Sequence, residues 1–211
     1  MTALVFALLP DQICIAMDTL VVGANDKKPM SFQRKFLPLR ENDLLIAGTG
    51  LANLINGWFE YVSSLSDLGD IDDLNKFASN VLQESVRAVG GLGENTATLY
   101  HFGYSKAESK YVGYAYRSTT EFRSERLQYA LGLKPQVQIT TCENIEFPSF
   151  LIDVILEQQR QDHSLPIEQQ VGIGGEIEFA VLTDRTMRIE TVHRFATYES
   201  ERHYIESTEN S

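Results

Sequence analysis

The sequence predicts a mixed α+β fold in which two antiparallel sheets stack and the helices lie outside them. Three observations lead to this class. Extended segments come in pairs joined by short turns, segments with helical periodicity are grouped between those pairs, and a chain of 211 residues with 43% hydrophobic residues can bury one sizeable core. No internal repeat or linker divides the chain, so we expect one domain over residues 1–196 and a polar tail over 197–211 that frays.

The first quarter of the chain predicts two hairpins. Apolar residues 2–9 are followed by a turn at Pro10 and by a second apolar strand that ends at Asp18. Residues 19–22 remain extended, and residues 23–29 have the composition of a loop. The second hairpin joins residues 35–39 to residues 44–47.

Two helices are expected next, because apolar residues recur at helical spacing over 51–62 and again over 71–86. Acidic residues around Asp70 favour the start of the second helix, and Gly90 with Gly91 favours its end. The remaining elements, in order, are strands 96–104 and 110–117, an extended piece 121–130, a helix 148–161, and strands 176–183 and 187–195.

Composition excludes several classes of function. The formal charge of −11 opposes a nucleic-acid surface, which needs a basic stripe. No apolar run approaches the roughly 18 residues that cross a bilayer, and no signal peptide is visible, so we expect a cytoplasmic protein without membrane contact. The only cysteines are Cys14 and Cys142, and Cys14 reads as a buried hydrophobe, which makes a disulfide framework improbable.

Familiar cofactor and catalytic motifs are absent from the sequence. There is no glycine-rich nucleotide loop and no nucleophile elbow. The four histidines and both cysteines are isolated in the sequence, so no zinc site is expected; the histidines are His101, His163, His193 and His203. For His101 and His193, which fall on strands, a structural role is favoured over catalysis.

The candidate nucleophile is Thr2. If Met1 is removed, the α-amine of Thr2 lies beside its own hydroxyl, and an α-amine with a reference pKa near 8 is a usable general base. A neighbouring cation would favour the deprotonated hydroxyl, and a carboxylate would hold that cation in place. Lys35 and Asp18 are the candidates for these two roles. The N–H of Gly48 is the candidate oxyanion donor.

Each of these residues also has an ordinary structural interpretation. A threonine in second position is common, a strand-end aspartate often belongs to a turn, and a strand-edge lysine is usually solvated. Glycine at position 48 is ordinary in a turn that leads into a helix.

The first fifty residues resemble the opening of a proteasome β-type subunit or of the bacterial HslV peptidase. The motifs that carry the resemblance are Thr2, Ala16-Met17-Asp18, Arg34-Lys35 and Ile46-Ala47-Gly48, and a second match is Gly174-Gly175-Glu176-Ile177 with the strand that follows. The resemblance implies the four-layer αββα fold of N-terminal nucleophile (Ntn) hydrolases, a threonine-type peptidase with no cofactor, and assembly into a homo-oligomeric ring. It leaves open whether an ATP-driven unfoldase is a partner.

The chain departs from this family where active β-type sites carry supporting serine and acidic residues. The matching positions are Leu133, Gln170 and Ile173, and none can make the same hydrogen bonds. Three interpretations therefore stand at this point. The first is a threonine-type hydrolase of peptides or other amides, the second is an inactive proteasome-like structural or binding subunit, and the third is a stand-alone amidohydrolase that acts on a small molecule.

Overall fold

The computed structural model describes residues 2–23, 26–139 and 145–209, so Met1 and Cys142 lie outside the described residues. The strands are β1 (Leu4–Leu8), β2 (Gln12–Asp18), β3 (Leu20–Val22), β4 (Pro29–Phe32), β5 (Phe36–Leu39), β6 (Leu44–Gly50), β7 (Ala97–Ser105), β8 (Lys110–Arg117), β9 (Ser124–Arg126), β10 (Leu131–Lys134), β11 (Glu176–Thr183) and β12 (Thr186–Arg194). The α-helices are α1 (Ala52–Ser63), α2 (Ile71–Ala88), α3 (Ser149–His163) and α4 (Tyr198–Glu209).

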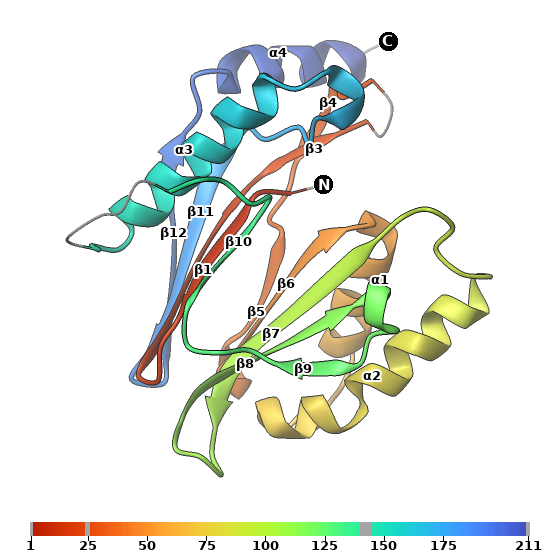
Figure 1. Cartoon of the computed structure of the whole chain (residues 1–211), viewed down its shortest axis with the longest axis vertical. Coiled ribbons are helices and arrows are strands. Elements are labelled where there is room, and N and C mark those ends of the chain that lie inside the picture. The colour runs from red at the N-terminus through yellow and green to blue at the C-terminus, as the bar shows by residue number, and fades with distance from the viewer. Residues whose placement is uncertain (1, 24–25, 140–144, 210–211) are drawn as a thin grey trace.

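Two five-stranded antiparallel sheets form the centre of the molecule. Their strand orders are β10-β1-β2-β11-β12 and β5-β6-β7-β8-β9, and β3 pairs with β4 in a separate two-stranded sheet. Helix α3 lies outside the first large sheet, α4 lies at the end of that sheet beside β4, and α1 and α2 lie outside the second sheet (Figure 1). The predicted fold class, a four-layer αββα arrangement with antiparallel sheets, is confirmed.

The continuous apolar character of the first strand follows from its central place in this stack. Leu4, Phe6 and Leu8 point between the two sheets, whereas Val5 and Ala7 point towards α3. Every residue of β1 is buried, because both faces of the strand are covered. A strand in such a place has no polar face to present to water.

The predicted start of α2 is confirmed in detail. The Asp70 carboxylate accepts hydrogen bonds from the N–H groups of Asp72 and Asp73, and the Asp73 carboxylate accepts from the N–H of Asp70. This reciprocal capping satisfies N–H groups that have no partner within the helix. The buried face of α2 consists of Ile71, Leu74, Ala78 and Leu82, which all belong to the predicted apolar stripe.

Two expectations about local structure are wrong. The predicted extended piece over 121–130 is interrupted: Glu121 and Phe122 adopt left-handed backbone angles, which turn the Phe122 ring into the core beside the helices, and the segment divides into β9 and the approach to β10. The predicted fraying does not hold for the described part of the tail, because residues 198–209 form α4 and bury Glu201 and Ile205. Tertiary contacts decide both segments.

Candidate functional site

The β1–β2 hairpin brings Thr2 to Asp18. Leu4 pairs with Met17 in the antiparallel register, so the chain on either side places Ala3 opposite Asp18. The N–H of Ala3 donates to Oδ1 of Asp18 at 2.8 Å. Side chains alternate along a strand, so Thr2 shares the inter-sheet face of Leu4, and it is only 9% exposed.

Asp18 is fully buried at the end of β2. Besides the Ala3 N–H, its carboxylate accepts hydrogen bonds from Nζ of Lys35 at 2.8 Å and, at 3.4 Å, from the N–H of Gly174. Burial raises the pKa of Asp18, and the Lys35 ammonium and the two N–H groups oppose that rise. Asp18 therefore depends on these partners to hold a charge in the interior.

Lys35 lies directly before β5, and two acceptors fix its ammonium group. Nζ donates to Oδ2 of Asp18 at 2.8 Å and to the carbonyl oxygen of Leu20 at 2.6 Å, and the side chain is 10% exposed. These acceptors use two of the three donors of the ammonium group. A carboxylate thus holds the predicted cation, and the action of Lys35 on Thr2 stays a prediction.

The pairing of β5 with β6 brings Gly48 next to Lys35. The ladder between β5 and β6 ends at the pair Phe36–Ala47, so the register carries Lys35 and Gly48 past the last pair on the same side. A Cβ atom at position 48 would lie 2.5 Å from Cγ2 of Ile55 in α1. Glycine is therefore required here for α1 to pack closely against β6.

A small pocket of about 110 Å³ lies beside these predicted site residues. Thr2, Lys35 and Gly48 all line it, together with residues of β3, the start of α1 and the segment before β5. Arg34 stands at the same pocket, and its guanidinium forms an ion pair with Glu178 of β11 at 2.6 Å. The structure thus brings the four predicted site residues together, with three at the pocket and Asp18 buried behind Lys35.

The three positions at which this chain lacks the family's supporting residues lie away from the pocket. Leu133 and Ile173 pack in the apolar cluster between the first sheet and α3, and Nε2 of Gln170 donates to the carbonyl oxygen of Leu165. None of the three is among the residues that line the pocket. The site is therefore built from a compact Thr-Asp-Lys-Gly group.

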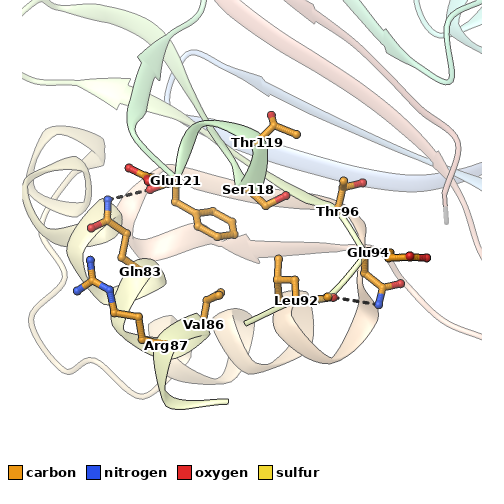
Figure 2. A pocket seen from close by; sticks show the side chains of 12 residues that line it. Gln83, Val86, Arg87, Leu92, Glu94, Thr96, Ser118, Thr119 and Glu121 are labelled. Carbon is orange, nitrogen blue, oxygen red and sulfur yellow. Dashed lines mark hydrogen bonds between the residues drawn. The ribbon is translucent and has the colours of Figure 1, made fainter. Parts of the chain in front are cut away.

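A larger pocket lies away from this chemistry. Figure 2 shows it between the C-terminal half of α2 and the loops around residues 92–96 and 118–122, with a volume of about 440 Å³. Its polar side chains include Gln83 and Asn95, whose amide groups already donate to backbone carbonyl oxygens. No predicted site residue lines it, so we assign the candidate chemistry to the smaller pocket.

His101 and Cys14 lie in the interior, away from the candidate pocket. His101 is fully buried, its Nε2 accepts a hydrogen bond from the indole N–H of Trp58, and burial lowers its pKa to about 3. Cys14 is buried, which raises the pKa of its thiol to about 12. Among the described residues, no group of three or more His, Cys, Asp or Glu side chains could hold a metal ion. Over the same ranges, no helix combines the length and apolarity that a membrane crossing requires.

One buried residue near the site, Glu201, was not predicted from the sequence. Glu201 of α4 is 9% exposed, and its Oε2 accepts a hydrogen bond from the N–H of Gly175 at 2.8 Å. The segment looks like a polar tail because charged residues dominate it. Glu201 and Ile205 lie one helical turn apart, but one of the two is charged, so their spacing gives too weak an apolar pattern to predict a packed helix.

Comparison with known proteins supports the fold only. No family model and no curated protein sequence matches the chain. Among solved structures, the Gly-1 mutant of Anbu from Hyphomicrobium sp. strain MC1 is similar with a TM-score of 0.67 and 11% identity, over 100% of this chain and 94% of that chain. At this identity the likeness shows the Ntn-hydrolase type of fold and leaves the chemistry to be argued from the site.

Proposed function

We propose that this chain is a threonine-type hydrolase of peptides or other amides that uses Thr2 as its N-terminal nucleophile after removal of Met1. The observation that carries the proposal is that Thr2, Lys35 and Gly48 line one pocket while the fully buried Asp18 holds the Lys35 ammonium. These residues lie up to 46 positions apart in the sequence; the β1–β2 and β5–β6 pairings each bring two of them together, and the Lys35–Asp18 ion pair joins the two pairs.

The proposed first step is acylation of Thr2. The α-amine takes the proton from the Thr2 hydroxyl as its oxygen attacks the amide carbonyl carbon, directly or through one water. The Lys35 ammonium lowers the pKa of that hydroxyl electrostatically, and Asp18 fixes the ammonium. The N–H of Gly48 donates to the oxygen that becomes negatively charged. The C–N bond then breaks, and the leaving amine takes the proton back from the α-ammonium.

The second step returns the enzyme to its starting state. The α-amine removes a proton from a water molecule, which attacks the ester carbon, and the carboxylic acid product leaves as the Thr2 oxygen regains its proton. These steps use only groups of the chain and water. By the resemblance stated above, we further propose that the chain works as a homo-oligomeric ring in the cytoplasm.

Intact-mass measurement tests this proposal. The purified protein is weighed before and after exposure to a β-lactone or an epoxyketone that captures N-terminal threonine. We expect a mass one methionine lighter than the full chain, and an adduct that disappears in Thr2→Ala. Retention of Met1 with no adduct in the wild-type protein contradicts the proposal.

The second candidate is a proteasome-like structural or binding subunit without hydrolytic activity. The apolar side chains of Leu133 and Ile173, and the Gln170 amide that bonds to a loop, favour it because the family's supporting hydrogen bonds have no counterpart there. This candidate predicts that oligomeric assembly survives Thr2→Ala unchanged and that the wild-type protein takes no threonine-directed adduct. Clean labelling of Thr2 would overturn it.

A further inference from the structure

We propose that the C-terminal helix positions the candidate catalytic pair: the Glu201 carboxylate of α4 holds the Gly174–Gly175 loop, and that loop holds Asp18 and Lys35. This inference deepens the proposed function and rests on it. It makes Glu201 a positioning residue, because Glu201 acts through the loop and is not among the residues that line the pocket.

The outer end of the connection is a buried hydrogen bond. Oε2 of Glu201 accepts from the N–H of Gly175 at 2.8 Å, and the Gly175 carbonyl oxygen accepts from the N–H of Phe195 at 3.1 Å. Among the described residues, no cation forms an ion pair with Glu201, so the loop N–H is a principal partner of this nearly buried carboxylate. A charge-assisted hydrogen bond to a backbone N–H is stronger than its neutral equivalent.

The inner end of the connection reaches both members of the pair. The N–H of Gly174 donates to Oδ2 of Asp18 at 3.4 Å, which is long for a hydrogen bond. The Gly174 carbonyl oxygen accepts from the N–H of Leu20 at 3.2 Å, and the Leu20 carbonyl oxygen accepts from Nζ of Lys35 at 2.6 Å. One residue, Gly174, therefore contacts the carboxylate through its N–H and reaches the ammonium through its carbonyl oxygen and Leu20.

The two glycines explain how the loop fits between the helix and the strand. A Cβ atom at Gly174 would lie 2.4 Å from Oε1 of Glu201 and 2.8 Å from the Leu20 side chain. Gly175 has φ of +76°, and a Cβ there would lie 2.5 Å from Oγ1 of Thr19. Because neighbouring atoms lie close to the loop on both sides, a shift of Glu201 moves the peptide group between Gly174 and Gly175.

Helix α4 is itself fixed close to the site. The Tyr198 ring stacks on the Phe32 ring of β4 at a centroid distance of 4.8 Å. The Arg194 guanidinium lies 4.3 Å from the centre of the Tyr198 ring. Figure 1 shows α4 beside the β3–β4 ribbon, whose residues Leu20, Val21 and Val22 line the candidate pocket. The helix is therefore placed to support the pocket from outside.

The test uses Glu201→Ala and Glu201→Gln in the full chain, with Glu199→Ala as a control on an exposed position of the same helix. Glutamine keeps an oxygen that accepts from the Gly175 N–H. Two quantities are measured: the rate of Thr2 labelling by a β-lactone, and the NMR position of the Ala3 amide. The Ala3 N–H donates to Asp18, so its amide reports on the carboxylate.

We expect Glu201→Ala to label roughly tenfold more slowly than wild type, since small misplacements of catalytic groups cost large factors in rate. Its Ala3 amide should be displaced, Glu201→Gln should show smaller changes in the same direction, and Glu199→Ala should show none. If Glu201 only anchors the helix, the melting temperature falls while the Ala3 amide and the labelling rate stay at their wild-type values, and that result overturns the inference.

Two further outcomes separate this inference from the proposed function. If wild-type protein is not labelled at all, the proposed function fails, and the Ala3 amide alone decides whether Glu201 positions Asp18. If Glu201→Ala does not fold, Glu201→Gln decides: an Ala3 amide at the wild-type position overturns the inference, and a displaced one supports it.

Discussion

The Asp18–Lys35 ion pair is the residue-scale feature on which the site depends. Asp18 is fully buried and the Lys35 side chain is 10% exposed, so water screens neither group effectively. Breaking such a pair by removing one partner leaves an uncompensated buried charge, which is more costly than removing both partners.

The first prediction concerns Lys35→Met. At pH 7 we expect this variant to lose about 3–5 kcal/mol of unfolding free energy, because Asp18 is left charged and buried. Burial raises the pKa of Asp18. A raised pKa in the folded state gives stability that is present below the unfolded value and is lost as the pH rises through the folded value. The deficit of Lys35→Met should therefore shrink as the pH falls towards 4.

Urea unfolding at pH 4, 5.5 and 7 measures this deficit. The double variant Asp18→Asn/Lys35→Met is the matched control, since it removes both charges and should recover most of the stability at pH 7. A deficit that is the same at all three pH values would show that packing by the lysine stem, and not the charge on Asp18, explains the loss.

His101 gives a second prediction at the residue scale. Its Nε2 accepts from Trp58, which places the proton on Nδ1, and within the described residues Nδ1 has no hydrogen-bond partner. Burial lowers the pKa of His101 to about 3, whereas an unfolded chain has a value near 6.5. Stability is therefore present above pH 6.5 and is lost as the pH falls towards 3.

Comparison of wild type with His101→Gln measures that loss. Wild type should lose up to about 5 kcal/mol between pH 6.5 and 3 from this group. Glutamine keeps an acceptor for Trp58 but does not titrate, so its stability should fall less steeply over the same range. Parallel curves for the two proteins would mean that other groups determine the acid sensitivity.

At the scale of elements, the contact between α1 and β6 determines the shape of the pocket. Gly48 and Ile55 meet there, and both line the pocket. A prediction follows for Gly48→Ala. The added methyl group overlaps Ile55, so we expect a loss of about 1–3 kcal/mol and slower labelling of Thr2, even though the N–H at position 48 is kept.

A double-mutant cycle with Ile55→Ala identifies the cause of that loss. The double variant should be more stable than the sum of the two single changes implies, because the smaller side chain makes room for the methyl group. Gly57→Ala in α1 is the control: nothing lies within 4 Å of its Cβ position, and alanine in a helix interior should leave stability unchanged or raise it. Additive losses in the cycle would contradict steric overlap as the cause.

At the scale of the whole molecule, the ring proposal makes a prediction about mass. One chain weighs 23.8 kDa, and we expect native mass spectrometry to find a single multiple of that value that corresponds to a closed ring. The formal charge of −11 adds repulsion between copies, so assembly should strengthen as salt is raised from low ionic strength. A monomer at all salt concentrations would remove the ring from the proposal while leaving the Thr2 chemistry to its own test.

The sequence by itself determined the elements whose signal is local or strongly periodic. The β1–β2 hairpin and the start of α2 at Asp70 depend on residues that are close together in the sequence, and the structure has them where the pattern predicts. Thr2 was predicted from its place directly after Met1, and Asp18, Lys35 and Gly48 from the roles that such a nucleophile needs and from the motifs that resemble a proteasome β-type subunit; their chemical roles stay a prediction. The fold class followed from the order of these elements.

Only the tertiary structure decided the features that depend on contacts between distant segments. Helix α4 is too polar to be predicted from its sequence; it packs beside β4, where Tyr198 stacks on Phe32, and buries Glu201 and Ile205. The break at Glu121 and Phe122 arises because the phenylalanine ring enters a core that the local sequence does not contain. A hydrogen bond between residues more than 150 positions apart, such as that between Asp18 and Gly174, produces no periodic pattern in the sequence, so only the structure shows it.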